Sequence, residues 1–555
     1  MEKRMIVAFV LSFLILMVWS FLFAPKQKQT PPSEKEIQEK AKETIAKSPE
    51  TPHLKPVILP KRDQKKDTLI KSNMEEKEVK VETPLYRAIF SSAGAIIKSF
   101  KLKRYHLTKD PDSPLIELVN LEENGGDFIK INFDTHSNPK SEKIMYHVKE
   151  DSIYLDPESS PRELTFSSTT SEGFALHQTF RFYPDRYHID LLVKLANNSE
   201  KQLEGNLRAQ LTNLPPKDKK SYYSFVGVAL LLNDELEEIK PKKMQEERDI
   251  SGKIGWMAYE DDYFLRAIIP EDQIEGRFKG RLLTSGILKA SYITPSIDLK
   301  SSEQVSSRFT LYLGPRDLDI LKQMGKKLDL AINFGWTDII AKPLHYALRF
   351  FNGYVHNFGV SIIILTILIK ILFWPLTHKS YKSMKEMQKL QPLMAKIREK
   401  YKDNREQMNK ELMGLYKTYK VNPMGGCLPM VIQIPVFFAL FRILGNSIEL
   451  RHAPFIFWVD DLSAPDRLFN FPFQIPFMSP PYGIPVLTLL MGASMFIQQK
   501  MTPTPGDPTQ AKIMMFLPVI FTVMFINFPS GLVLYWLTNN LLSIGQQYRI
   551  KKSSA

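Results

Sequence analysis

One lysine, Lys370, lies within a stretch that is otherwise suited to hydrocarbon, VSIIILTILIKILFWPLTHKS at residues 360–380. A lysine at the centre of a transmembrane helix costs about 2.5–3.5 kcal/mol on insertion scales. Each surrounding Ile, Leu or Phe contributes about −0.3 to −0.6 kcal/mol, so the helix still inserts and the charge need not be functional. The ammonium can snorkel to the nearby membrane surface, or it can attract an anionic group inside a polar cavity.

Other polar residues favour the cavity. Thr366 precedes Lys370 by one helical turn and shares its face. Gln433 lies in a second apolar segment, and a third carries Trp536, Asn540, Ser543 and Gln547 at helical spacing along one side. Hydrogen bonds between helices explain each of these residues singly. Because lipid cannot satisfy polar groups, all of them should face the inside of a helical bundle, and together with the lysine they indicate a wet cavity.

The apolar segments contain no Asp or Glu residue. A proton or ion relay normally needs carboxylates, and a structural buried lysine normally has a paired one. Any anionic partner of Lys370 would therefore come from elsewhere, and a polypeptide passing through is the candidate. The sequence also has no P-loop, HExxH or GxSxG pattern. We therefore expect no nucleotide requirement, no catalytic residue, no metal and no cofactor.

The elements that must position these residues are six expected transmembrane helices. The first, residues 5–24, has about the 20 apolar residues that a spanning helix needs. Its length and poor cleavage site favour an uncleaved anchor over a signal peptide. The other five are expected at about 358–377, 424–445, 483–501, 511–529 and 531–548.

The loop charges predict the orientation of these helices. Residues 378–420 hold twelve Lys or Arg against five acids, whereas residues 446–482 hold two Arg against four acids. Basic loops stay in the cytoplasm, so both termini and 378–420 should be cytoplasmic. The net charge of +14 accordingly indicates a membrane surface as partner, in preference to nucleic acid.

The sequence divides into regions that differ in composition and hydrophobic periodicity. We expect an anchor at 1–24, a flexible tether at 25–82 that is too polar to bury a core, and a β-sandwich at 83–315 with period-2 alternation. Its many aromatic residues are expected in the core, with a ligand-binding face as the alternative. A linker with an interfacial amphipathic helix follows at 316–357, then a membrane helix at 358–377, a cytoplasmic helical hairpin at 378–423, membrane helices within 424–548 and a short tail at 549–555.

The hairpin should be held by a short seam between two antiparallel helices, split at Asp403 and Asn404. Apolar residues recur at helical spacing on both sides of that split. They are Met387, Leu390, Met394, Ile397, Met408, Leu412 and Leu415.

Three stretches resemble the YidC/Oxa/Alb family of membrane protein insertases: VSIIILTILIKILFWPLTHKSYKSMKEMQKLQP, LYKTYKVNPMGGCLPMVIQIPVFFALF and LPVIFTVMFINFPSGLVLYWLTNN. The anchor and large outer domain resemble the Gram-negative form. The resemblance implies an all-β periplasmic supersandwich and a five-helix core with a groove open to the cytoplasm and lipid. A positive residue, usually arginine, lies in that groove and matches Lys370; Thr366, Gln433 and Trp536 match other groove positions. Asn540, on the same helix as Trp536, completes the expected substrate-binding set.

The same resemblance implies a membrane protein insertase and chaperone of the inner membrane, not an enzyme. Its expected partners are nascent membrane proteins, the Sec translocon, membrane lipids and the ribosome, the last only weakly because the chain ends at KKSSA. Two alternatives stay open: a small-solute transporter or channel, and an anchored carbohydrate-binding or sensor protein.

Overall fold

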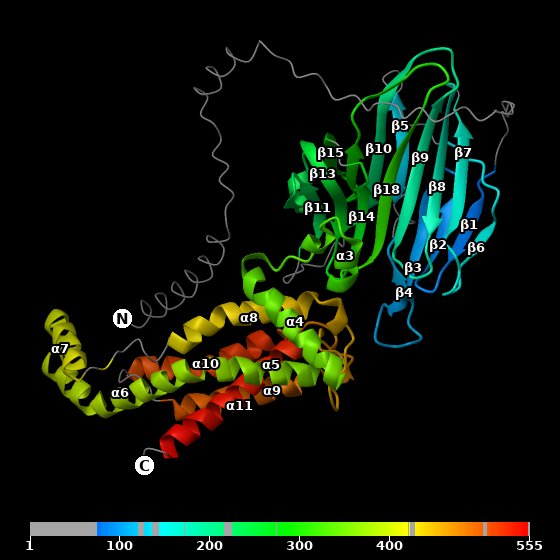
Figure 1. Ribbon diagram of the computed structural model, residues 1–555. Helices are drawn as coiled ribbons and strands as arrows, with labels where there is room; N and C mark the ends of the chain where they lie inside the picture. Colours follow the sequence, from blue (N-terminus) through cyan, green and yellow to red (C-terminus); the bar gives the residue numbers. More distant parts are fainter. Residues whose placement is uncertain are drawn as a thin grey trace, which may run out of the picture. The chain divides into compact units, whose positions relative to one another are not determined.

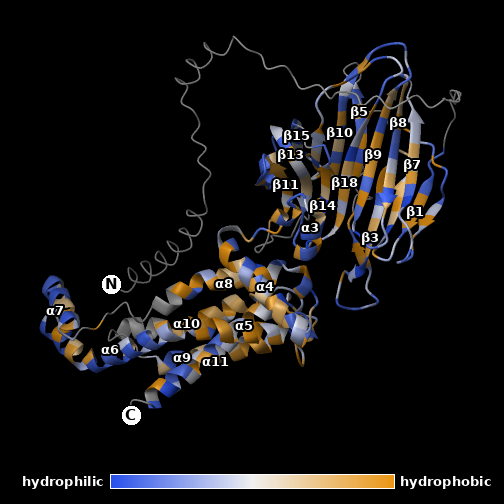
Figure 2. Cartoon of the chain, viewed as in Figure 1, coloured by the Kyte–Doolittle hydropathy of each residue, from blue (hydrophilic) through white to orange (hydrophobic). Residues whose placement is uncertain are grey.

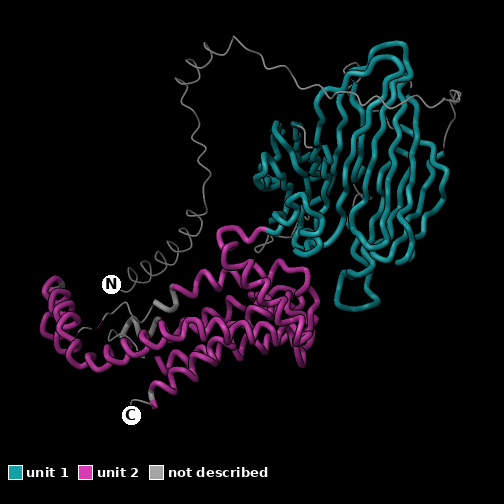
Figure 3. The backbone as a smooth tube through the Cα atoms, in the orientation of Figure 1, with its two compact units in different colours: residues 1–332 teal, residues 333–555 magenta. Residues whose placement is uncertain are grey.

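The computed structural model describes residues 75–119, 127–135, 144–170, 172–215, 225–272, 275–419, 421, 428–502 and 508–552. The expected anchor and nearly all of the tether, residues 1–74, lie outside this set. So does most of the VNPMGGCLP motif. The chain divides into two compact units, Met1–Ile332 and Asn333–Ala555 (Figure 3).

Unit 1 is built from β-strands in two principal sheets (Figure 1). The five-stranded sheet has the order β4-β3-β2-β1-β6. Its strands are β1 (Glu78–Glu82), β2 (Tyr86–Ser91), β3 (Ile96–His106), β4 (Leu115–Glu117) and β6 (Ser152–Tyr154). Its neighbours are antiparallel except for β1 and β6, which are parallel.

The 13-stranded sheet runs in the order β17-β10-β16-β15-β13-β14-β18-β9-β8-β7, with β5 paired to β10 and β11 paired to β12 and β13. Its strands are β5 (Ile129–Thr135), β7 (Arg162–Thr169), β8 (Phe174–Phe182), β9 (His188–Asn197), β10 (Leu203–Asn213), β11 (Gly227–Leu232), β12 (Glu235–Ile239), β13 (Arg248–Glu260), β14 (Phe264–Pro270), β15 (Glu275–Leu282), β16 (Leu288–Ile293), β17 (Ile297–Leu299) and β18 (Gln304–Pro315).

Alternating apolar residues explain both the strands and their packing. In β9, Ile189, Leu191, Val193 and Leu195 are buried while the residues between them are at least partly exposed, as expected of a strand with one face on a core. Rings of β2 meet rings of the second sheet: Phe90 lies 5.1 Å from Phe180 and 5.5 Å from Phe182 between centroids. These aromatic residues therefore pack the core between the sheets, as the sequence predicted.

The end of unit 1 is a short helical linker. It comprises α3 (Leu318–Met324) and the 3-10 turn η2 (Leu328–Ala331); another 3-10 turn, η1 (Pro241–Met244), precedes β13. Asp317 caps α3 by accepting hydrogen bonds from the amides of Asp319 and Ile320. Arg316 fixes the linker to the sheet, since its guanidinium lies 3.1 Å from the Glu260 carboxylate and donates to the Ala331 carbonyl at 2.6 Å.

Unit 2 is a helical bundle (Figure 1). Helix α11 packs against α9 and α5, α4 against α5 and α8, and α10 against α9. The helices are α4 (Asp338–Val355), α5 (Phe358–Leu372), α6 (Trp374–Lys400), α7 (Arg405–Thr418), α8 (Leu428–Asn446), α9 (Val486–Met501), α10 (Pro508–Phe525) and α11 (Ser530–Lys552), with the short elements η3 (Gly335–Thr337), η5 (Ile448–Leu450), β19 (Leu468–Phe471) and β20 (Tyr482–Ile484).

The structure divides the segment 358–377 between two helices. The span expected at 358–377 stops as α5 at Leu372, and the first hairpin helix already starts at Trp374. Pro375 lies in the first turn of α6. Proline has no amide hydrogen and its ring clashes with the carbonyl four residues earlier, so a straight helix cannot continue through it.

Among the described residues, only one bent pair of helices has the length and hydropathy of a membrane span. No helix there meets both the length and the hydropathy that a bilayer crossing requires. Helices α5 and α6 meet them only as a pair, bent by 63° at their break.

The hairpin seam is confirmed by the packing of α6 on α7. Leu390, Met394 and Leu412 are buried in one cluster with Val421. The other four expected seam residues pack against it, namely Met387, Ile397, Met408 and Leu415.

Helix α4 is amphipathic, as expected for 316–357. It buries Ala341 and Leu348 in the bundle and exposes Ile339 and Tyr354. Figure 2 shows the mixture of hydrophobic and hydrophilic residues along it.

Candidate functional site

Lys370 lies in the last turn of α5 and is only 5% exposed. Its Nζ donates a hydrogen bond to Ser543 Oγ at 2.6 Å and one to Asn539 Oδ1 at 3.5 Å, both on α11. Ser543 in turn donates to the Asn539 main-chain carbonyl at 2.7 Å. Among the described residues, the structure records no ion pair for Lys370. Neutral oxygens of one neighbouring helix therefore hold its charge.

Thr366 lies one turn before Lys370 on the buried face of α5 and is 1% exposed. Its hydroxyl donates to the Ile362 carbonyl of the same helix at 2.6 Å. A threonine bonded in this way has its donor satisfied within its own helix, so it needs no polar partner on a neighbouring helix. Thr366 therefore shares the face of the lysine, as predicted, while its hydroxyl bonds to its own helix.

Polar residues that share one side of α11 bind different neighbouring elements. Asn540 Nδ2 donates to Ser494 Oγ of α9 at 3.0 Å, and Gln547 donates to Thr502 beyond the end of α9 at 3.3 Å. By contrast, Ser543 and Asn539 face α5, and Gln546 exchanges hydrogen bonds with Thr377 of α6. An α-helix turns 100° per residue, so adjacent residues such as 539 and 540 serve different neighbours.

Trp536 belongs to an aromatic cluster that joins three helices. Its indole lies 5.0 Å from the Phe437 ring of α8, and 5.1 Å and 6.1 Å from the rings of Phe525 and Phe521 of α10. Gln433 is half-buried one turn before Phe437 on the same face of α8. These contacts put Trp536 at the junction of α8, α10 and α11, and Gln433 lies one turn from that junction on α8.

The five expected residues thus lie on or around α11 and bind different partners. Lys370 and Thr366 lie on the α5 side, Asn540 on the α9 side, and Trp536 with Gln433 toward α8 and α10. Sequence reasoning missed Asn539 and Ser494, which complete the hydrogen bonds of Lys370 and Asn540. Asn539 lies one turn before Ser543, and this spacing could have identified it.

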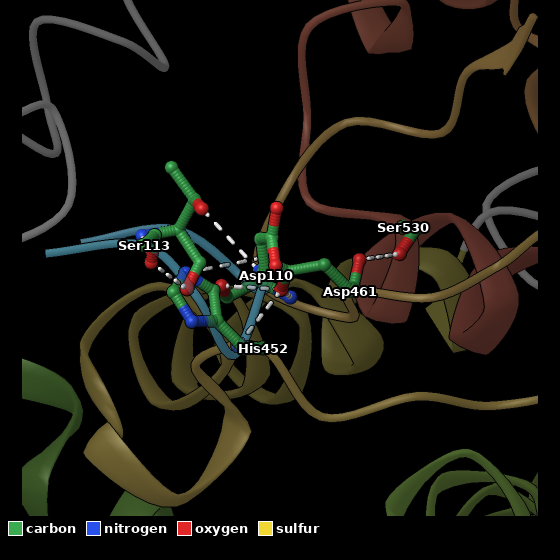
Figure 4. Close-up of polar contacts among 7 residues, drawn as sticks. Asp110, Ser113, His452, Asp461 and Ser530 are labelled. Atoms are coloured by element: carbon green, nitrogen blue, oxygen red, sulfur yellow. Dashed lines mark hydrogen bonds and ion pairs between the residues drawn. The ribbon is translucent and has the colours of Figure 1, made fainter. Parts of the chain in front are cut away.

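A different polar cluster fixes the start of α11. The Asp461 carboxylate accepts hydrogen bonds from the amides of His452 at 3.2 Å and Ser463 at 2.8 Å. Its main-chain carbonyl accepts from the Ser530 hydroxyl at 2.7 Å, as drawn in Figure 4. Asp461 therefore has a structural role: it connects the α8–α9 loop to the first residue of α11.

The side chains around α11 can act by electrostatic attraction and hydrogen bonding. Within the described part of the chain, no group of three or more His, Cys, Asp or Glu side chains is arranged to hold a metal ion. Around α11 the bundle offers one buried cation, several neutral hydrogen-bonding groups and an aromatic cluster. Such a set can attract an anionic group and accommodate apolar surface.

Comparisons with known proteins cover both units. The family model described as "YidC periplasmic domain" matches residues 78–347, and the one described as "60Kd inner membrane protein" matches residues 350–555. A membrane protein insertase YidC of Syntrophobacter fumaroxidans is 42% identical over 557 residues, covering 100% of both chains. The protein of that name from Pelobacter propionicus is also 42% identical, over 100% of this chain and 99% of its own.

One solved structure, described as an active YidC insertase with the first transmembrane domain resolved, is also similar. It is 19% identical over 86% of this chain and 93% of its own, with a TM-score of 0.37.

Proposed function

The chain belongs to the YidC family of membrane protein insertases, and from this premise we propose how it handles nascent membrane proteins, its substrates. It is an inner-membrane protein with a periplasmic, β-rich domain. The transporter or channel that the sequence left open receives no support from its relatives, which are named insertases.

We propose that the chain crosses the membrane six times with both termini in the cytoplasm. The α6–α7 hairpin and the α8–α9 loop lie at opposite ends of the bundle (Figure 1). The first is strongly basic and the second is slightly acidic, and basic loops stay in the cytoplasm. The hairpin then faces the cytoplasm and the α8–α9 loop faces the periplasm.

Lys370, Thr366, Gln433, Trp536 and Asn540 line the substrate groove in this proposal. The observation that carries it is the buried ammonium of Lys370, held by Ser543 and Asn539 alone among the described residues. A buried cation without a carboxylate is costly, and an acidic residue of an incoming segment can relieve that cost. The groove thus attracts acidic, hydrophilic segments from the cytoplasm while neutral polar groups shorten the hydrocarbon that these segments must cross.

The apolar part of the substrate leaves along α8 and α10. Both helices expose large apolar side chains, such as Ile432 on α8 and Phe516 and Ile520 on α10. Trp536 contacts both helices and connects their inner faces to the groove. Burial of apolar area in lipid, at about 25 cal/mol per Å², drives release of the segment. The process needs no catalytic residue, so the protein acts as an insertase and chaperone without being an enzyme.

Other partners follow from the surfaces. The exposed apolar residues of α4 suit the membrane interface, and the basic hairpin suits lipid headgroups or ribosomal RNA. We propose that the protein works with or without the Sec translocon and that the basic α6–α7 hairpin is its contact with the ribosome.

Reconstitution tests the proposal. Purified full-length protein in liposomes should insert a short substrate, carrying one apolar segment and an acidic translocated segment, without nucleotide. Liposomes that lack the protein are the control. Ion or solute flux through the proteoliposomes without insertion of the substrate would refute the insertase mechanism and favour a channel.

A further inference from the structure

The α8–α9 loop contains an aromatic hairpin, which we define as residues 468–484. Its strands β19 and β20 pair antiparallel, with Leu468 opposite Ile484 and Phe471 opposite Tyr482. Residues 468–481 read LFNFPFQIPFMSPP, with four phenylalanines, four prolines and no charged residue. This composition is unusual for a loop that meets only water, because loops there are generally polar.

Three of the four phenylalanine rings of the aromatic hairpin are exposed. Phe477 is 81% exposed, Phe469 67% and Phe473 59%. Phe473 also stacks on Phe471, with centroids 5.3 Å apart and planes only 4° apart. The prolines restrict the backbone, so the rings are displayed in a preorganised form and lose little freedom on binding.

Two of the exposed phenylalanines have a strained backbone. Phe469 and Phe477 have φ of +61° and +63°, a region that bulky residues rarely occupy. Such strain persists where the surroundings impose it, and it gathers at functional sites. Here the strained residues hold apolar rings outside the protein, and contact of these rings with water does not compensate the strain energy.

Arg467, which precedes the aromatic hairpin, and Asn527 of the bundle clamp the main chain of the hairpin to the helices. Arg467 donates to the Pro481 carbonyl at 2.8 Å and to the Ile526 carbonyl at 2.9 Å. Asn527 accepts from the Ser479 amide at 2.7 Å and donates to the Phe477 carbonyl at 2.9 Å. Ile526 and Asn527 form the turn between α10 and α11, so the aromatic hairpin is fixed to the helices.

We propose that the aromatic hairpin inserts its rings into the headgroup–acyl boundary of the outer leaflet. This inference rests on the proposed function, in which α8 and α9 cross the bilayer and hold their connecting loop at its surface. Aromatic rings favour the membrane interface, and burial of apolar area is the driving force. Because 468–481 carries no charge, insertion should not depend on anionic lipid. The hairpin anchors the periplasmic end of α9, α10 and α11 against the pull of a departing substrate.

Site-directed fluorescence quenching tests the inference. In a Cys427→Ser background, which removes the only cysteine, Phe477→Cys is labelled with an environment-sensitive fluorophore in proteoliposomes. Lipids with a nitroxide near the headgroup should quench this label, and exchange of zwitterionic for anionic lipid should leave the quenching unchanged. The matched control is Asp460→Cys, an exposed position in the same loop, whose label should stay accessible to a water-soluble quencher.

A second label separates this inference from the topology. Phe516→Cys on α10, 67% exposed, should be quenched by mid-chain nitroxide lipids if that helix crosses the bilayer. Quenching at 516 without quenching at 477 would overturn the hairpin anchor and leave the topology intact. Loss of both would overturn the topology as well. Shielding of 477 in native membranes but not in proteoliposomes would also overturn the anchor, because a protein would then cover the rings.

Discussion

Lys370 and Ser543 form the contact on which the site depends, and its contribution to stability can be measured. Ser543→Ala removes the 2.6 Å partner of the ammonium and leaves the longer contact to Asn539. We expect a loss of about 1–3 kcal/mol, because a buried charge is left poorly satisfied. Thermal unfolding in one detergent measures it.

Ser494→Ala is the matched control for that experiment. It removes a serine–amide contact between two helices, Ser494 with Asn540, without involving a charge. Interhelical bonds of this kind average about 0.6 kcal/mol in membrane proteins. Equal losses in the two variants would mean that water, and not Ser543, stabilises the ammonium.

Glu260 in unit 1 predicts a pH dependence. Burial raises the pKa of its carboxyl from 4.5 to about 8, against the opposing charge of Arg316. Between these values the folded carboxyl holds more proton than the unfolded one, so the free energy of unfolding falls as the pH rises, by up to about 1.4 kcal/mol per pH unit. Glu260→Gln should flatten this slope in urea unfolding of residues 75–332 between pH 5 and 8.

The control for Glu260 is Glu163→Gln on β7, whose side chain is 56% exposed. It should leave the slope unchanged, because it removes an exposed carboxylate and keeps the buried Glu260–Arg316 pair. A slope that survives Glu260→Gln would assign the pH dependence to other groups.

At the scale of single elements, the α6–α7 hairpin should open independently of the bundle. Leu390→Ala removes a seam residue that is 4% exposed and should cost about 2–5 kcal/mol locally. The seam is short, so we expect fast amide hydrogen exchange throughout α6 and α7 while α9 and α11 stay protected. Leu393→Ala, 36% exposed on the same helix, is the control and should change little. Exchange in the wild-type hairpin as slow as in α11 would contradict its mobility.

The α6–α7 hairpin also shows which structural features a sequence pattern can predict and which it cannot. All seven seam residues follow from helical periodicity, because periodic apolar residues record which face of a helix is buried. The break at Phe373 was not predicted, since a proline in an apolar run is also compatible with a kinked span. The division of α11 between α5 and α9 depends on how neighbouring helices are placed, which periodicity within one helix does not contain.

At the scale of the whole molecule, the β domain should be separable from insertion. Each unit is compact by itself, and the residues of the proposed groove all lie in unit 2. Deletion of residues 83–315 should therefore reduce insertion of a simple, single-span substrate by no more than a few-fold. Complete loss of insertion with an intact helical bundle would favour the sensor or carbohydrate-binding alternative, in which the β domain is indispensable.

The β domain was the most predictable part of the molecule and the surroundings of the candidate site were the least. Alternation in segments such as β9 follows directly from having one buried face, so the strands could be read from the chain. The surroundings of Lys370 depend on Asn539 and Ser543, some 170 residues away in sequence. Pairing over that separation is set by bundle packing, and only the charge itself was visible in the sequence.

The central claim is that Lys370 attracts acidic residues of the substrate, and one insertion-rate series tests it most directly. A single substrate whose translocated segment carries zero to three aspartates is inserted by the wild type and by Lys370→Arg, Lys370→Ala and Lys370→Glu. A charge pair that contributes about 1–2 kcal/mol after desolvation changes a rate-limiting step roughly five- to thirtyfold. We expect the arginine variant to behave as the wild type, the alanine variant to lose rate only with acidic substrates, and the glutamate variant to lose most as aspartates are added. The same dependence on aspartate number in all four proteins would contradict the account, and Lys370 would then only hold its helix at the cytoplasmic interface.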